Sequence, residues 1–303
     1  MYRYRRLLVG LNLGEEDKTI IRYASMVSRL AKSEKIYFIH VAETLDIPKE
    51  LLEEYPELLH PVDEFAENKM KEMVQQHFDR DSDAEVVYEV VQGSPLAELL
   101  RSAQSKEIDL ILVGRKQQRK EIGKLPEKLA RKAPCSVLIV PGGTEAKITK
   151  IVAPVDFSDN SADAMDAAIA FASAAGITNI LCPHVYSFSL GFASTGITPK
   201  KFASILKKQL QKDYQNFISR LDFKGISPTA IFLPESDPSR AISKLAKKQG
   251  ADLLVIGTRG RSAEAVLLGS VVERLIHTAD IPLIAVKKKG TGSSFLTALL
   301  RKL

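Results

Sequence analysis

The chain has 303 residues, of which 45% are hydrophobic and 26% charged, and its net charge is +6. This length allows two ordinary domains, and this composition excludes a disordered chain. A modest positive charge permits an anionic partner without indicating specific nucleic-acid binding. Cys135 and Cys182 form neither a disulfide framework nor a metal-binding spacing, which favours a reducing, cytoplasmic setting. No apolar run is long enough to predict a membrane span or a signal sequence.

The first half of the sequence contains short apolar segments that are typical of buried strands. The strand candidates are 6–12, 36–42, 108–114 and 136–140. They are apolar without alternation, as expected for strands of a parallel sheet that is covered on both faces. The third candidate is followed by a basic cluster, formed by Arg115, Lys116, Arg119, Lys120, Lys124, Lys128, Arg131 and Lys132. The plain interpretation of this cluster is a solvated loop and helix, and the alternative is an anion or partner site.

The second half repeats this series at an offset of 143 to 146 residues. Its strand candidates are 150–156, 179–186, 251–257 and 282–286. An ordered series with nearly constant spacing indicates a tandem duplication, with the boundary in the Pro- and Gly-containing segment 141–146. We therefore predict domains at 1–141 and 147–288, followed by a tail at 289–303. The tail is a basic linker with a short apolar segment, which we expect to pack on its own protein or on a partner.

Helical patterns lie between the strands of the second half. They cover 161–174, 202–221, 238–248 and 271–278, and the third begins with a capping Asp237 followed by Pro238. Alternation of strands and helices predicts an α/β fold. Five strands are countable in each half, of which four have the bounds given above. The expected architecture is two tandem doubly wound, Rossmann-like domains, each with a five-stranded, mainly parallel sheet flanked by helices.

A glycine-punctuated loop follows the strand candidate 251–257. It reads Gly257-Thr-Arg-Gly260, then eight residues, then Gly269-Ser270 at the start of a helix. Glycines let the backbone approach a ligand closely, and a helix N-terminus supplies unpaired N–H donors, so this layout favours anion binding. If the first and fourth strands flank the point where strand order reverses, Asp156 and this loop meet there.

This combination resembles the universal stress protein family, and the duplication resembles its two-domain members. The family pattern has a strand-end aspartate, a valine after the second strand, and Gly-x2-Gly-x9-Gly-Ser/Thr after the fourth. The resemblance implies a stress-response role and binding of ATP or another adenine nucleotide, with or without Mg²⁺ or Mn²⁺. It also implies an intramolecular pseudo-dimer through 137–140 and 283–286, with further homodimerisation and unidentified protein partners left open.

The resemblance implies a role for each matching residue of the second half. Asp156 and Val185 would hold the nucleoside. Ribose and phosphates would be surrounded by Gly257, Gly260, Gly269, Ser270 and the amide of Val271. By their chemistry alone, Arg259, Arg261 and Ser262 could add phosphate contacts.

Two departures from the family pattern bear on binding. Eight residues separate Gly260 from Gly269, where the family has nine, and this deletion would tighten the pocket. In the first half, Asn12 replaces the aspartate and the Gly-Ser pair becomes Gly123-Lys124, so we predict that this half does not bind ATP.

Other residues point to structure rather than to chemistry. His40 and His184 occupy corresponding strand ends, which favours a structural position repeated by the duplication. No P-loop, nucleophile elbow or paired metal-binding histidines are present, so an enzyme is not expected. The alternatives to a regulatory nucleotide-binding protein are a nucleotide-free interaction protein that uses the basic cluster and, less favoured, a slow ATPase.

Overall fold

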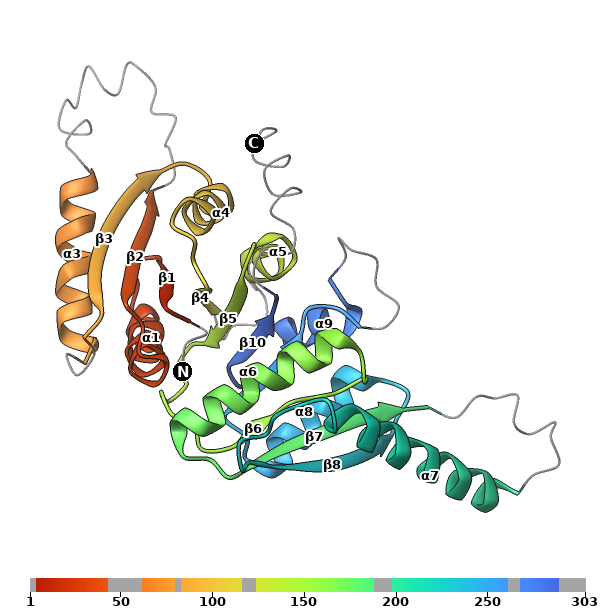
Figure 1. Cartoon of the computed structure of the whole chain (residues 1–303). Helices are drawn as coiled ribbons and strands as arrows, with labels where there is room; N and C mark the ends of the chain where they lie inside the picture. The colour runs from red at the N-terminus through yellow and green to blue at the C-terminus, as the bar shows by residue number, and fades with distance from the viewer. Residues whose placement is uncertain are drawn as a thin grey trace. The chain divides into compact units, whose positions relative to one another are not determined.

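The computed structural model describes residues 4–42, 62–79, 83–115, 124–187, 198–260 and 268–288. The chain divides into two compact units, unit 1 with residues 1–147 and 289–303 and unit 2 with residues 148–288. Figure 1 colours the elements of unit 1 from red to yellow-green and those of unit 2 from green to blue. The predicted tail 289–303 lies outside the described residues.

Unit 1 is a parallel five-stranded sheet in the order β3-β2-β1-β4-β5. Its strands are β1 (Arg6–Leu11), β2 (Lys35–Ala42), β3 (Glu85–Gln92), β4 (Leu110–Arg115) and β5 (Ser136–Pro141). Its described helices are α1 (Asp17–Ala31), α3 (Val62–His77), α4 (Pro95–Ser105) and α5 (Leu125–Lys132). The predicted doubly wound order is thus confirmed for this unit, because β1 pairs with both β2 and β4.

Unit 2 repeats the arrangement in the order β10-β9-β6-β7-β8, again with parallel neighbours. Its strands are β6 (Ile151–Val152), β7 (Asn179–Tyr186), β8 (Ser227–Pro234), β9 (Leu253–Gly257) and β10 (Leu283–Val286). Its described helices are α6 (Asp159–Ala175), α7 (Pro199–Ile218), α8 (Pro238–Gln249) and α9 (Ser270–Thr278). Because the crossovers run in opposite directions from β6, α6 and α7 cover one face of the sheet and α8 and α9 the other (Figure 1).

The strand β6 is shorter than predicted, although the chain beyond it stays extended. The prediction was 150–156, whereas regular pairing ends at Val152. Pro154 has no N–H to give to a sheet, which interrupts the ladder. Ala153 and Val155 still donate to β7, to the carbonyls of Leu181 at 2.8 Å and Pro183 at 2.9 Å.

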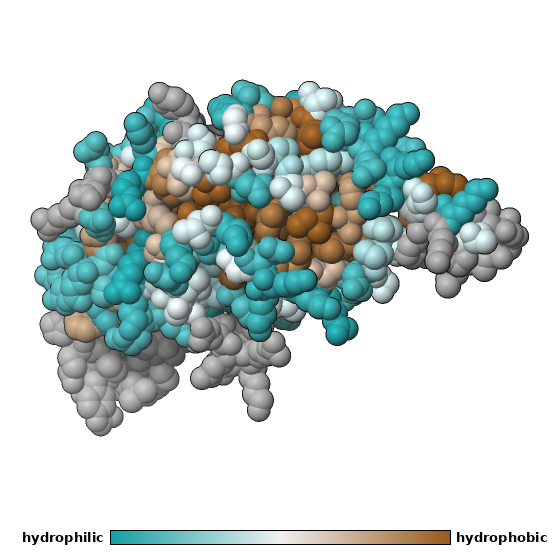
Figure 2. Space-filling view, turned by 90° about the horizontal axis from the view of Figure 1, so that it is seen from below, coloured by the Kyte–Doolittle hydropathy of each residue, from teal (hydrophilic) through white to brown (hydrophobic). Residues whose placement is uncertain are grey.

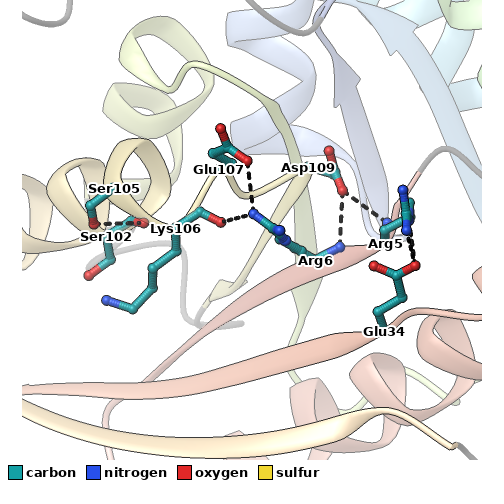
Figure 3. Close-up of polar contacts among 8 residues, drawn as sticks. All are labelled: Arg5, Arg6, Glu34, Ser102, Ser105, Lys106, Glu107 and Asp109. Atoms are coloured by element: carbon teal, nitrogen blue, oxygen red, sulfur yellow. Dashed lines mark hydrogen bonds and ion pairs between the residues drawn. The ribbon is translucent and has the colours of Figure 1, made fainter.

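A repeated aspartate fastens the beginning of the first strand in each unit. The Asp109 carboxylate accepts the backbone N–H of Arg5 at 2.9 Å and of Arg6 at 3.0 Å (Figure 3). In unit 2, the Asp252 carboxylate accepts the N–H groups of Thr149 and Lys150, each at 3.0 Å. The parallel Ile108-Asp109 and Ala251-Asp252 segments therefore share a structural role, since each satisfies backbone donors ahead of a central strand.

The core of each unit is formed by buried apolar side chains. Tyr23 and Phe38 in unit 1 and Phe171 in unit 2 are fully buried. On the face drawn in Figure 2, apolar patches lie between hydrophilic residues. Among the described residues, the large apolar side chains that are exposed are Phe65 at 74% and Ile205 at 52%. None of the described helices has the length and hydropathy needed to cross a membrane.

The predicted cap of α8 is confirmed and leads to a pH prediction. The Asp237 carboxylate accepts the Ser239 hydroxyl at 2.6 Å and the Arg240 N–H at 3.2 Å, and these bonds lower the pKa of Asp237. A lowered folded-state pKa stabilises the fold above the unfolded-state pKa of about 3.9, and this stabilisation is lost as pH falls through the lower folded-state pKa. Asp237→Asn keeps an N-cap oxygen without the titration. We expect it to flatten the acid limb of stability, measured as urea midpoints against pH; an unchanged limb would contradict this role.

Both cysteines lie in the core. The exposed fraction is 2% for Cys135 and 0% for Cys182. Burial raises the pKa of the Cys182 thiol to about 12, so this thiol stays protonated and unreactive at pH 8. We expect Ellman's reagent to label neither cysteine in the native protein and both after unfolding in guanidinium. Rapid labelling of the native protein would show that the core opens.

Candidate functional site

A cavity of about 520 Å³ lies in unit 2, at the carboxyl ends of its central strands. β6 pairs with β7 on one side and with β9 on the other, so the strand order reverses here. The chain that follows β6 and the chain that follows β9 diverge at this point, which leaves a crevice between them. The cavity therefore occupies the place where ligands bind in open α/β sheets.

Most of the predicted site residues line this cavity. They are Asp156, Val185, Gly257, Arg259, Gly260, Gly269, Ser270 and Val271. Residues about 100 apart in sequence thus meet, as the predicted topology required. Arg261 and Ser262 lie outside the described residues. The remaining wall includes Pro154, Pro183, Ile242 and Leu268, an apolar lining that the sequence motifs did not identify.

Asp156 is held by two serines that sequence reasoning missed. Its Oδ1 accepts the Ser158 N–H at 3.1 Å and the Ser158 hydroxyl at 2.6 Å, together with the hydroxyl of Ser161. The Ser158 hydroxyl oxygen in turn accepts the Ser161 N–H at 3.2 Å, which caps α6. The carboxylate is therefore oriented before any ligand arrives. The sequence pattern Asp-x-Ser-x-x-Ser could have indicated that these serines orient Asp156.

The aromatic residue after Asp156 packs on a strand-end histidine. Phe157 stacks on His184, with ring centroids 4.3 Å apart and planes at 13°. His184 donates Nδ1–H to the Val155 carbonyl at 2.8 Å, and His40 does the same to Leu11 at 2.9 Å in unit 1. The repeated geometry confirms the predicted structural role of both histidines. The next residue, Val185, lines the cavity of unit 2.

The glycines of the loop after β9 serve different purposes. A Cβ at Gly257 would lie 2.6 Å from the Asn160 carbonyl oxygen, so this glycine lets α6 approach β9. A Cβ at Gly260 would lie 2.8 Å from Oδ2 of Asp156. Gly269 has no such contact, since the nearest atom is the Thr258 carbonyl oxygen at 3.6 Å. Packing therefore requires glycine at 257, and a Cβ at 260 would displace the Asp156 carboxylate, whereas Gly269 leaves space beside its backbone.

The two ends of the shortened loop meet at one hydrogen bond. The Gly269 N–H donates to the Thr258 carbonyl at 2.9 Å. Gly269 is the N-cap of α9, so the helix begins at Ser270 and the N–H groups of Ser270 and Val271 have no intrahelical acceptor. They lie in the lining of the cavity with the positive end of the helix dipole. An anion in the cavity would find these donors and Arg259.

The corresponding place in unit 1 holds a cavity of only about 20 Å³. Asn12 stands where unit 2 has Asp156, and Asp17 stands where it has Ser161. Asp17 is buried, its carboxylate accepts the Gly14 N–H at 3.3 Å, and burial raises its pKa. Unit 1 thus has its carboxylate at the start of α1, whereas unit 2 has it after the strand β6. The buried side chain of Arg115 occupies the position of Thr258.

This burial corrects one part of the predicted basic cluster. Arg115 is 8% exposed and belongs to the end of β4, because its neighbour on the sheet is Pro141 of β5. Lys124, Lys128 and Arg131 are exposed, as the plain interpretation predicted. Lys116, Arg119 and Lys120 lie outside the described residues. Among the described residues, the exposed part of the cluster therefore lies on α5 and at its N-cap.

Within the described part of the chain, no group of three or more His, Cys, Asp and Glu side chains is placed to hold a metal ion. The cavity of unit 2 offers one carboxylate, Asp156, which already accepts two hydroxyl groups. A hard cation such as Mg²⁺ would need further oxygen ligands from phosphates and water.

The universal stress protein family model matches the chain twice, at residues 3–141 and 147–287. The chain belongs to the universal stress protein family. Curated relatives match about half of this chain or less. A universal stress protein of Methanocaldococcus jannaschii is 34% identical over 142 residues, which covers 46% of this chain and 82% of the relative. A second universal stress protein from the same organism is 27% identical over 157 residues, which covers 47% of this chain and 96% of the relative.

Solved structures match the whole tandem chain. A universal stress protein from Archaeoglobus fulgidus is 17% identical with a TM-score of 0.62 and covers 94% of this chain and 99% of that one. A functionally unknown protein from Pseudomonas aeruginosa is 16% identical with a TM-score of 0.67 and covers 99% and 98%. These likenesses confirm the tandem α/β fold. Another solved universal stress protein, a complex with cAMP, is 16% identical with a TM-score of 0.33 and covers 46% of this chain and 98% of that one.

Proposed function

We propose that unit 2 binds ATP or a related adenine nucleotide as a regulatory ligand in a stress response. The observation that carries the proposal is the cavity of about 520 Å³ where the strand order reverses, lined by eight predicted residues. Its volume lies within the range of about 300–1,000 Å³ that is usual for small-molecule sites. Its apolar walls and its few polar groups suit a base at one end and an anion at the other.

The arrangement of the lining supports one orientation of the nucleotide. Asp156 is fixed by two serines and could accept hydrogen bonds from the nucleoside, while the Val185 backbone edges the same region. The phosphates would lie at the start of α9, against the amides of Ser270 and Val271 and near Arg259. Mg²⁺ or Mn²⁺, where present, would be held chiefly by these phosphates.

We propose further that unit 1 does not bind nucleotide. Its cavity of about 20 Å³ is too small for a base, and the buried Arg115 and Asp17 fill the region that is open in unit 2. A cytoplasmic location, the pairing of 137–140 with 283–286 and the identity of protein partners remain predictions.

The groups around the cavity also support a role in binding rather than catalysis. Asp156 is occupied by the hydroxyls of Ser158 and Ser161, and His184 is stacked on Phe157 with Nδ1 bonded to a carbonyl. Neither is placed as a general base for water attack on a phosphate. We therefore propose that the protein is not an enzyme and that any ATP hydrolysis is incidental.

Thermal unfolding of the purified full chain tests the proposal. Adding about 1 mM ATP with Mg²⁺ or Mn²⁺ should raise the melting temperature, because a ligand that binds only the native state stabilises it. Mass spectrometry of small molecules released from the purified protein should detect an adenine nucleotide. No thermal shift and no released nucleotide would instead favour a nucleotide-free interaction protein.

A further inference from the structure

Unit 2 contains a second cavity, of about 780 Å³, between α8 and α9. We call it the α8–α9 groove. Its floor is formed by Ser243 and Ala246 of α8, Leu254 of β9, and Ala279 and Ile281 from the segment between α9 and β10. It shares no lining residue with the nucleotide cavity, which uses other faces of the same two helices. The groove is therefore a separate site on this unit.

Cations of α8 form one wall of the groove. Arg240, Lys244 and Lys247 all line it, and their spacing of four and three residues places them on one helix face. No ion pair joins any of the three to a described acidic residue. On the opposite wall, Arg274 lies 3.6 Å from Asp237. The wall on α8 thus carries positive charge that the described residues of the unit leave unneutralised.

The duplication provides an internal comparison for this wall. With α4 of unit 1 aligned on α8, Ala97 stands at Arg240 and Gln104 at Lys247. The counterpart of Lys244 is Arg101, which forms an ion pair with Glu98 on its own helix. The row of free cations is therefore absent from the described α4, and the shared fold does not require it.

The floor of the groove differs between the units in the same way. Unit 1 has the fully buried Leu100 where unit 2 has Ser243. The Ser243 hydroxyl is shielded from solvent and makes no hydrogen bond to a described group. A smaller residue stands on the groove side of α8, and it leaves a polar atom without a partner.

The chemistry of the groove selects one kind of occupant. Two adjacent helices over an apolar floor accept a third helix, whose apolar side chains enter the space between them. Free cations along one wall select acidic side chains at matching spacing. A nucleic-acid backbone has no apolar side chains and would make little use of an apolar floor.

We propose that the α8–α9 groove binds an amphipathic, acidic helical segment of a partner protein. Its leucine-like side chains lie on the floor at Ala246 and Ile281, and its carboxylates pair with Arg240, Lys244 and Lys247. This proposal does not depend on nucleotide binding by the other cavity.

Fluorescence anisotropy on the full chain tests it with a labelled synthetic helix. In this peptide, Leu recurs at helical spacing and Glu occupies the flanking positions. Lys244→Glu with Lys247→Glu should weaken binding by about tenfold or more, since two attractive pairs become repulsive. The control is Lys207→Glu with Lys208→Glu on α7, which makes the same change of net charge on exposed residues outside the groove. The control should bind the peptide as the native chain does.

A second variant separates shape from charge. Ser243→Leu introduces the residue that unit 1 has at this position and fills the floor without altering the cations. It should also weaken binding, while a peptide with Ser in place of Leu should not bind. Equal losses in both charge-reversed proteins, or tight binding of the Ser peptide, would overturn the proposal. Binding of an oligothymidylate in place of the peptide, with the same dependence on Lys244 and Lys247, would also overturn it in favour of nucleic acid.

Discussion

Replacing Gly269 with Asp is expected to abolish the rise in melting temperature that ATP gives the native chain. The new carboxylate would stand beside the amides of Ser270 and Val271, where it would repel the phosphates and compete for their donors. At a nucleotide concentration of about 100 times Kd, the lost stabilisation is about 2.7 kcal/mol. Differential scanning fluorimetry with and without ATP measures the shift in melting temperature.

The fold of unit 2 should survive this change. Gly269 has a φ of −63°, which any residue adopts, and a Cβ there would meet its nearest neighbour at 3.6 Å. Aspartate is also a favourable N-cap, so the melting temperature without nucleotide should not fall. Gly123→Asp, at the corresponding position of the first half, is the control and should leave the ATP shift intact. If Gly269→Asp retains the shift, the nucleotide does not bind at the start of α9.

Gly257→Ala is expected to destabilise unit 2 by about 1–3 kcal/mol, the usual cost of forcing an extra methyl group into a packed site. The added Cβ would lie 2.6 Å from the carbonyl oxygen and 2.9 Å from the carbonyl carbon of Asn160. Both are backbone atoms at the start of α6, so a whole helix must shift. Urea unfolding followed by circular dichroism measures the loss.

The duplication supplies a matched control for this substitution as well. Gly114 stands at the corresponding position in β4 of unit 1, and a Cβ there meets no atom within 4 Å. Gly114→Ala should therefore change the free energy of unfolding by less than about 0.5 kcal/mol. Equal effects of the two substitutions would show that α6 does not require its close approach to β9.

The candidate site was predictable from sequence where it depends on strand ends and on glycine spacing. Asp156, Val185 and Gly269 line the cavity because parallel strands present their carboxyl ends at one edge of the sheet. The role of Gly257 was only partly predictable. A glycine motif does not reveal whether its missing side chain makes room for a ligand or for another helix, and the contact with Asn160 shows the second.

Residues that act through three-dimensional contacts were the hardest to predict. Ser158 and Ser161 were not predicted as site residues, although together they orient Asp156. Arg115 was counted with a solvated basic cluster because its neighbours in sequence are basic, whereas the end of β4 buries it. Burial depends on what lies across the sheet, and local composition does not record this.

The duplication, the alternation of strands and helices and the family were predictable from the chain alone, because apolar runs and repeated motifs are properties of the sequence. The folded structure was needed to show which half retains an open site. The two cavities, of about 520 and about 20 Å³, differ through a few side chains that meet across the loops. The folded structure was also needed to show that the cations of α8 line a groove, unlike other surface lysines. An open volume and an unneutralised charge are sums over residues far apart in sequence, and they exist only once the chain has folded.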